Sequence, residues 1–231
     1  MPDLSKRSLQ IELMDNLQCE GRVVVQTLQE LDIINKWLGG NNVTLRGLQK
    51  LLNNSSDPLH IIDIGCGSGE ILKQIGQKYK GRSFSLTGID ANPNIVAIAN
   101  QQAGSHSGIR IITEDILSKT FSERNCDIML ATLFLHHFTD EQLINIFTRM
   151  KKQTRTGIVV NDLHRHSLAY YSIMWLTRLF SKSPMVKVDA PLSVQRGFKR
   201  AELTNILEQA GITNYKLKWK WAFRWQLIIH T

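Results

Sequence analysis

Ten residues, HIIDIGCGSG from His60 to Gly69, constrain the fold of this 231-residue chain more than any other stretch. The run His60–Ile64 is short, apolar and β-branched, which is typical of a buried strand. Three glycines follow it, and a helical pattern of apolar residues begins at position 71. Because glycine permits a positive φ and leaves backbone N–H groups open beside a helix N-terminus, this order predicts a nucleotide-binding turn.

The spacing of the glycines separates this turn from two other nucleotide-binding loops. A dinucleotide fingerprint needs a small residue at position 70, where the chain has Glu70, and the G-x-x-x-x-G-K-[ST] loop is absent. The remaining pattern, D-x-G-x-G-x-G, resembles the first motif of the class I S-adenosylmethionine (SAM) methyltransferases. That resemblance implies a SAM site that includes Asp63, Gly65, Cys66, Gly67 and Gly69.

Acidic residues also follow the next two predicted strands. Phe84–Ile89 ends in Asp90, and Ile109–Thr113 leads to Asp115. A carboxylate in such a position can accept hydrogen bonds from both ribose hydroxyls of an adenosine. The resemblance gives this role to Asp90, and it implies that Asp115 meets the adenine amino group. It also places Ala91, Ile116 and Leu133 beside the cofactor.

The alternation of strands and helices predicts an α/β fold, with a doubly wound, seven-stranded, mostly parallel sheet and an antiparallel C-terminal strand. Four more strands are expected, at Asp127–Leu133, Gly157–Asn161, Asn214–Trp221 and Phe223–His230. Helices are expected at Glu20–Leu38, Leu45–Leu52, Ser167–Phe180 and Ala201–Ala210, and from the capping box of Thr139 and Gln142 to about Lys152. The class I methyltransferases resemble this arrangement in their antiparallel last strand.

We expect a single domain over residues 1–231, with a helical cap at about 1–55 and a substrate lid inserted at about 163–198. A break at Asn53–Pro58 follows the cap. Within the lid, Pro184–Arg196 contains two prolines and is expected to be a loop that closes over the site.

Composition places limits on the cellular setting and on metal or disulfide chemistry. Hydrophobic residues make up 42% of the chain, enough for a core, and the three cysteines lack paired spacing. We therefore expect neither a disulfide framework nor a metal site. No leader and no apolar run of membrane-spanning length is seen, so we expect a cytoplasmic protein without a transmembrane segment.

Charge is distributed unevenly along the chain. Residues 1–148 carry 13 Lys and Arg against 16 Asp and Glu, whereas residues 149–231 carry 15 against 4. A basic C-terminal third permits nucleic acid, an anionic membrane surface or an acidic substrate as partner, and it does not choose among them. Peripheral contact with a membrane is therefore one of the interactions that the sequence permits.

Two polar clusters follow the fourth and fifth strands, where ligands of doubly wound sheets bind. One is His136-His137, and the other comprises Asp162, His164, Arg165 and His166. Histidine, with a pKa of about 6.5, can take a proton at neutral pH from an acceptor such as a phenol, and arginine can stabilise a phenolate. We therefore predict that His136, His164 and Arg165 are catalytic, whereas His137 is expected to pack or cap.

The segment Ser167–Phe180 is apolar almost all round and contains two tyrosines, a methionine and a tryptophan. A helix of this kind is expected to bury both faces, and a pocket that it lines would suit a flat aromatic or lipid-like substrate. The run LHHF resembles the ubiquinone-biosynthesis branch of class I enzymes. The pairing of INKWLGG with NDLHR resembles small bacterial methyltransferases that accompany type III polyketide synthases. These resemblances imply methylation, mainly on oxygen, of a hydroxylated polyketide, phenolic or quinone-like aromatic.

Two other functions remain as alternatives. An RNA methyltransferase would use the basic C-terminal third and the surfaces of Trp219, Trp221 and Trp225. No Asn/Asp-Pro-Pro-aromatic segment follows the fourth strand, and the tryptophans alternate in a predicted edge hairpin, so nucleic acid is the less favoured partner. The third possibility is a SAM-binding subunit without catalysis. The sequence does not predict an oligomeric state.

Overall fold

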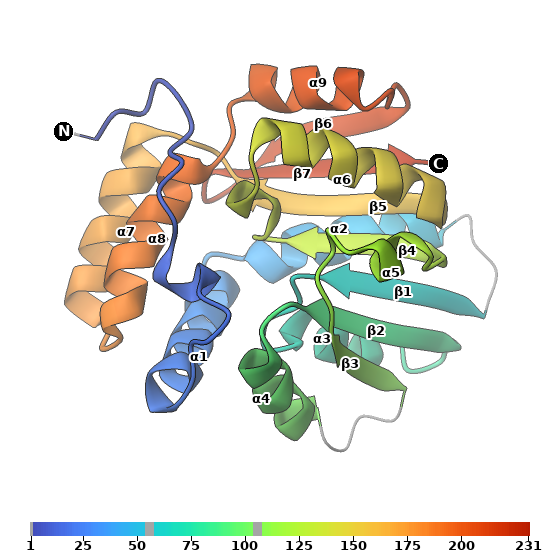
Figure 1. Ribbon diagram of the computed structural model, residues 1–231, viewed down its shortest axis with the longest axis horizontal. Coiled ribbons are helices and arrows are strands. Elements are labelled where there is room, and N and C mark those ends of the chain that lie inside the picture. The colour runs from blue at the N-terminus through green and yellow to red at the C-terminus, as the bar shows by residue number, and fades with distance from the viewer. Residues whose placement is uncertain (1, 54–57, 104–107) are drawn as a thin grey trace.

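The computed structural model describes residues 2–53, 58–103 and 108–231. Its sheet has seven strands in the order β3-β2-β1-β4-β5-β7-β6 (Figure 1). Strands β1 to β5 pair in parallel, whereas β7 is antiparallel to both β5 and β6. The predicted doubly wound fold is confirmed. The strands are β1 (Leu59–Ile64), β2 (Phe84–Asp90), β3 (Ile109–Thr113), β4 (Cys126–Thr132), β5 (Thr154–Leu163), β6 (Tyr215–Lys220) and β7 (Arg224–His230).

Helices cover both faces of the sheet. One face carries α2 (Gly40–Leu52), α3 (Glu70–Lys78) and α4 (Pro93–Ala103), and the other carries α5 (Lys119–Ser122), α6 (Asp140–Gln153) and α9 (Arg200–Gln209). Side chains alternate between the faces of a strand, so Ile61 packs in the cluster beneath α2 and α3 and Ile62 in the cluster beneath α6. Two apolar cores thus hold the sheet in place.

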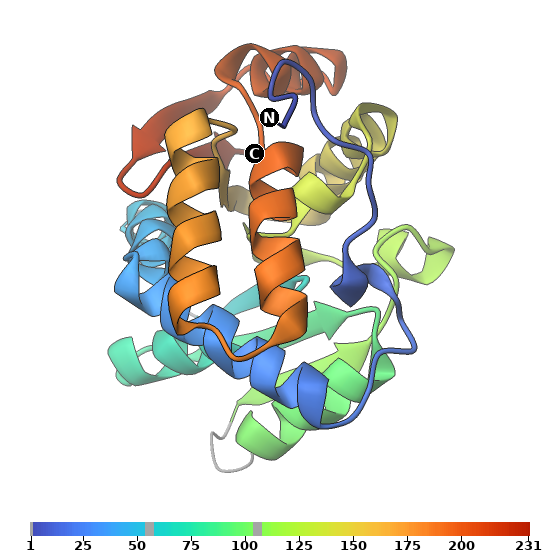
Figure 2. The same ribbon diagram turned by 90° about the vertical axis from the view of Figure 1, so that its left-hand side faces the viewer.

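A third group of helices lies beyond the carboxyl ends of the parallel strands. It consists of α1 (Arg22–Trp37), the 3-10 turns η1 (Leu13–Asp15) and η2 (Leu135–His137), α7 (Ser167–Phe180) and α8 (Pro184–Arg196). Figure 2 shows α7 and α8 side by side at the front of this end, with α1 below them. The connections that leave the neighbouring strands β1 and β4 run to opposite faces of the sheet. Ligands of such sheets bind where this happens, at the carboxyl ends of the strands.

Two helices differ most from the sequence-based expectation. Pro184–Arg196 is helix α8, not a loop. The Ser183 side chain accepts a hydrogen bond from the Val186 N–H, and Pro184 lies in the first turn, where its missing N–H is not needed. Helix α2 begins at Gly40, five residues before the predicted start, because Leu38 and Gly39, the latter with φ +69°, are enough to separate it from α1. Of the expected break after α2, residues 54–57 lie outside the described residues.

Helix α7 has the predicted bounds but does not bury both faces. Ala169 and Thr177 are buried, whereas Trp175 is 57% exposed and Phe180 is 74% exposed. The expectation of a fully covered helix is wrong because α8 covers one side of α7 only. Among the described residues, no helix combines the length and apolar character that crossing a bilayer requires.

Candidate active site

The turn after β1 has the backbone conformation that the glycine pattern predicts. Gly65, Gly67 and Gly69 have φ values of +62°, +51° and +70°, and α3 begins at the next residue. A Cβ atom on Gly65 would lie 2.1 Å from the ring of Phe134. Glycine is therefore required at position 65 by the neighbouring aromatic ring as well as by φ.

Asp90, at the end of β2, is held by this turn. Its Oδ2 accepts the Gly67 N–H at 3.1 Å, and its Oδ1 accepts the Asn92 N–H at 3.0 Å. Burial raises the pKa of the carboxyl. Each carboxylate oxygen can accept a further hydrogen bond, so Asp90 can receive a pair of ribose hydroxyls.

Two further carboxyls lie near the turn. Asp63 is buried, and its Oδ1 has no hydrogen-bond partner among the described residues. Burial and the charge of Asp90 raise the pKa of Asp63 to about 8. Asp32, on α1, accepts a hydrogen bond from the Ser68 hydroxyl at 3.0 Å, and burial raises its pKa to about 6. An orphaned buried acceptor indicates a ligand that brings donors or positive charge, which suits the amino-acid and sulfonium groups of SAM.

A cavity of about 630 Å³ begins at this turn, within the usual size range of small-molecule sites. Of the ten predicted cofactor residues, nine line it: Asp63, Gly65, Cys66, Gly67, Asp90, Ala91, Asp115, Ile116 and Leu133. Gly69 does not line it and instead precedes α3 as its N-cap. Leu133 has φ +53° and donates its N–H to the Asn161 carbonyl at 2.8 Å, which fixes the chain where β4 leaves the sheet.

The other end of the cavity contains His136. Its Nδ1 lies 2.7 Å from Asp162 Oδ1, and its Nε2 lies 3.6 Å from Glu12 Oε1. Burial alone would raise the pKa of Asp162, but the charge and hydrogen bond of His136 lower it below the ordinary value. Burial raises the pKa of Glu12 to about 7. Neither Nε2 nor Oε1 has a hydrogen-bond partner within the described parts of the chain.

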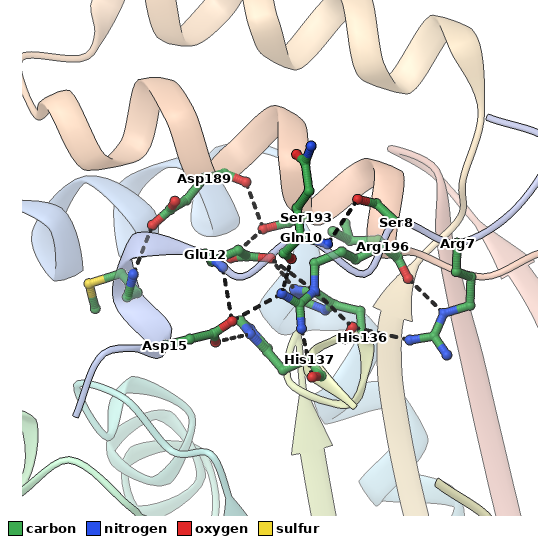
Figure 3. A network of polar contacts seen from close by, with 12 residues as sticks. Arg7, Ser8, Gln10, Glu12, Asp15, His136, His137, Asp189, Ser193 and Arg196 are labelled. Atoms are coloured by element: carbon green, nitrogen blue, oxygen red, sulfur yellow. Dashed lines mark hydrogen bonds and ion pairs between the residues drawn. The ribbon is translucent and has the colours of Figure 1, made fainter. Parts of the chain in front are cut away.

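Glu12 reaches this place through an N-terminal strap, residues 7–15, that runs along α8 from Gln195 to Asp189; Figure 3 shows its polar contacts. The Arg196 guanidinium donates to the carbonyls of Gln10 and His137 and to Asp15. Asp189 accepts the N–H groups of Leu13 and Met14 at 2.8 and 3.1 Å. The strap is thus bound to the core by side chains of α8, far away in the sequence.

His137 also lines the cavity, and its Nδ1 lies 2.5 Å from Asp15 Oδ1. The ring also packs beside Phe134 and His136, as expected for a histidine that packs or caps. The pairing with Asp15 has no local sequence signal, because Asp15 is 122 residues away along the chain.

His164 and Arg165 do not line the cavity. The Arg165 guanidinium is fully buried and donates to Glu202 and to the carbonyl of Gly197. His164 accepts the indole N–H of Trp219 at 3.2 Å and packs beside Trp225, and burial lowers its pKa. Both side chains lie away from the cavity, so neither fits the catalytic position that the sequence suggested.

Residues 61–157 match the family model described as "Methyltransferase domain". Phosphoethanolamine N-methyltransferase of Plasmodium falciparum is 31% identical over 115 residues, which are 49% of this chain and 41% of that protein. The chain thus spans about two fifths of the length of the curated relatives it matches.

Solved structures with this fold cover more of the chain. The plantazolicin methyltransferase BpumL in complex with S-adenosylhomocysteine (SAH) has a TM-score of 0.66 and 17% identity, over 90% of this chain and 89% of that one. An O-methyltransferase family 2 protein from Planctomyces limnophilus, in complex with apigenin, has a TM-score of 0.61 and 14% identity, over 94% of this chain and 63% of that one. At these identities the likeness shows the fold, which is that of the SAM-dependent methyltransferases.

Proposed function

We propose that this protein is a SAM-dependent methyltransferase that methylates a hydroxyl group of a small, largely apolar aromatic acceptor. The observation that carries the proposal is one continuous cavity, with the glycine turn at one end and the His136–Glu12 pair at the other. A cofactor and an acceptor can therefore meet inside it.

The residues of the first end fit the cofactor. Asp90 would hold the ribose, Ile116 and Leu133 would lie against the adenine, and Asp63 and Asp32 would face the amino-acid part. SAM, when bound, supplies an electrophilic methyl group on a sulfonium. Asp63 Oδ1 is buried without a hydrogen-bond partner among the described residues, and a cationic ligand would supply one. This is the feature of the cofactor end that most directly favours such a ligand.

The acceptor would enter beside α7 and α8. Ala169, Ile173, Leu176 and Val194 give this part of the cavity apolar walls, which suit an aromatic ring. The acceptor hydroxyl would reach His136 Nε2 and Glu12 Oε1, which have no hydrogen-bond partner among the described residues. This pair would take the hydroxyl proton as the acceptor oxygen gains the methyl group that SAM supplies, and SAH would be released as a neutral thioether.

Asp162 is a positioning residue in this scheme. It accepts N–H groups from the backbone of Leu135 and His136 as well as the His136 ring, so it fixes both the turn and the tautomer of the histidine. The Nε2 lone pair is thereby left toward Glu12 Oε1, 3.6 Å away.

The test is formation of SAH from SAM with alkylresorcinols, hydroxyquinones, hydroxybenzoic acids and total RNA as acceptors. His136→Ala should lower turnover about 100-fold or more, as removal of a general base does, with SAM affinity within about threefold of the wild type. His164→Ala is the matched control, because this histidine follows the next strand and does not line the cavity. Equal losses in both variants would contradict the proposal.

The alternatives are distinguished by the same panel. Trp221 is 75% exposed, and Lys216, Lys218 and Lys220 lie on the edge strand β6, so an RNA acceptor has a basic surface available. Lysines on an edge strand also prevent pairing with other chains, which explains them without a partner. Product with RNA alone would establish that reading, and SAM binding without any product would indicate a non-catalytic subunit.

A further inference from the structure

The cavity end at η2 brings together three side chains that suit a metal ion. Glu12, His136 and His137 each offer one ligand atom, and these atoms all lie within 4.8 Å of one another. Two histidines with one carboxylate are a common ligand set for borderline divalent metals. The sequence does not show the set, because Glu12 and the histidines are more than 120 residues apart.

The geometry around the two histidines fits metal ligation. The Nδ1 atom of His136 is bonded to Asp162 at 2.7 Å, and that of His137 to Asp15 at 2.5 Å. Metal-binding histidines usually donate their second ring N–H to a carboxylate, which fixes the ring and raises its basicity. In both rings this leaves Nε2 as the free nitrogen.

Two of the ligand atoms are buried without a partner. The side chains of His136 and Glu12 are 3% and 5% exposed, and neither His136 Nε2 nor Glu12 Oε1 has a hydrogen bond to any described residue. They lie 3.6 Å apart. Two atoms that each bind Zn²⁺ at about 2.1 Å in tetrahedral geometry are about 3.4 Å apart. The spacing is thus that of two ligands of one ion.

The charges at this point also favour a cation. Glu12, Asp15 and Asp162 bring three carboxylates, whereas the Arg196 guanidinium pairs with Asp15 and lies 3.7 Å from Glu12. The Arg7 guanidinium is engaged with Asp140. A divalent ion would balance the excess negative charge, which is costly in a buried place.

We propose that Glu12, His136 and His137 bind a borderline divalent cation such as Zn²⁺ at the acceptor end of the cavity. The inference rests on the proposed function for its purpose: the open coordination positions would hold the acceptor oxygen opposite the methyl group. In the ion-bound protein the cation takes over the role proposed above for the His136 Nε2 lone pair, which then binds the ion. The cation stabilises the oxyanion, so the acceptor loses its hydroxyl proton to water more readily.

The site would be selective by ligand chemistry. Imidazole nitrogens suit Zn²⁺ and other borderline ions, whereas Mg²⁺ prefers oxygen ligands alone. The strap, which supplies both Glu12 and Asp15, would be fixed more firmly when the ion is bound. Cation binding should therefore raise the melting temperature.

The experiment is a titration of chelator-treated protein with Zn²⁺ against a chromogenic competing chelator, without SAM or acceptor. We expect one Zn²⁺ per chain at this site, at least tenfold weaker binding in His137→Ala and in Glu12→Gln, and no displacement by millimolar Mg²⁺. Glu12→Gln is nearly isosteric and can keep the hydrogen bond from Ser193, so it tests ligation in a folded chain. His230→Ala is the matched control, since His230 lies opposite Gly157 near the start of β5, at the other end of the strands from the site.

Equal Zn²⁺ affinity in the wild type, His137→Ala and Glu12→Gln would overturn the inference. Its failure is distinguishable from that of the proposed function. Full methyl transfer in excess chelator, with no Zn²⁺ bound, would remove the cation site and keep the enzyme. Stoichiometric Zn²⁺ binding that depends on His137 and Glu12, with no acceptor methylated, would keep the cation site and remove the proposed function.

Discussion

The two ends of the cavity are built from the chain in different ways. Most of the cofactor end comes from one stretch, in which β1, the glycine turn and β2 follow one another within residues 59–90. The acceptor end joins the N-terminal strap, η2 and the end of α8, which are separated by more than 100 residues at the first step and about 60 at the second. Local sequence patterns therefore describe the first end well and the second end poorly.

The contrast also shows where the acceptor specificity of such a fold can change. The glycine turn needs positive φ and close approach, as the contact between Gly65 and Phe134 shows, so few residues fit there. At the acceptor end, side chains of α8 bind the strap, and a strap of different sequence could be bound in the same way. We expect changes at the first end to affect the cofactor and changes at the second to affect the acceptor.

The largest effect is expected for Asp90→Ala. Loss of the carboxylate removes the acceptor for two ribose hydroxyls and for two backbone N–H groups. Each lost bond from a ribose hydroxyl to the charged group is worth roughly 1.5 kcal/mol, so SAM affinity should fall about 100-fold. Calorimetry measures the change, and Asp90→Asn should fall between the variant and the wild type. An unchanged SAM affinity would remove β2 from the proposed cofactor site.

For Arg196→Met we expect a smaller effect, on acceptor turnover and stability rather than on SAM affinity. The buried guanidinium binds the strap to η2, so its loss should lower the acceptor's kcat/KM at least tenfold and the stability by about 3 kcal/mol, as for other broken buried pairs. SAM affinity should stay within about threefold.

Arg165→Met is the matched control for this variant. Arg165 is also a buried arginine paired with a carboxylate, but it lies outside the cavity. It should lose comparable stability, measured by chemical unfolding, with little change in acceptor kinetics. If Arg196→Met weakens SAM binding as much as it weakens acceptor turnover, the two ends are not separable.

The smallest effect is expected for Asp63→Asn, on the pH dependence of stability in the protein without ligand. The pKa of this carboxyl is raised to about 8 by burial, so the folded chain holds a proton that the unfolded chain has lost above about pH 4. Stability should therefore decrease as the pH rises from about 4 to 8, and the variant should lack this contribution.

Thermal unfolding from pH 5.5 to 8.5 measures that difference. The melting temperature of Asp63→Asn should gain on the wild type by several degrees as the pH rises, because the wild type loses about 1.4 kcal/mol for each pH unit below the raised pKa, while the SAM affinity of the variant falls. A constant difference across this range would mean that Asp63 titrates normally. The cofactor end would then carry no cost to stability.

Particular residues show how far the sequence determined the structure. It determined the sheet, the cofactor turn and the bounds of α7, because strands, glycine spacing and apolar periodicity are local signals. The position of His136 after β4, where it lines the cavity, followed from local signals too. It misplaced Arg165 and His164, because the position of a side chain one or two residues beyond a strand depends on the elements that pack against it.

Only the tertiary structure decided the acceptor end. Glu12 and Asp15 stand in a segment with no periodic pattern, and nothing near them in the sequence indicates a partner. Their roles arise because the Arg196 guanidinium and the Asp189 carboxylate bind the backbone and side chains of the strap at the mouth of the sheet. A hydrogen bond between distant segments leaves no mark in the local sequence of either, so the sequence determines the cofactor end and the folded chain determines what meets it.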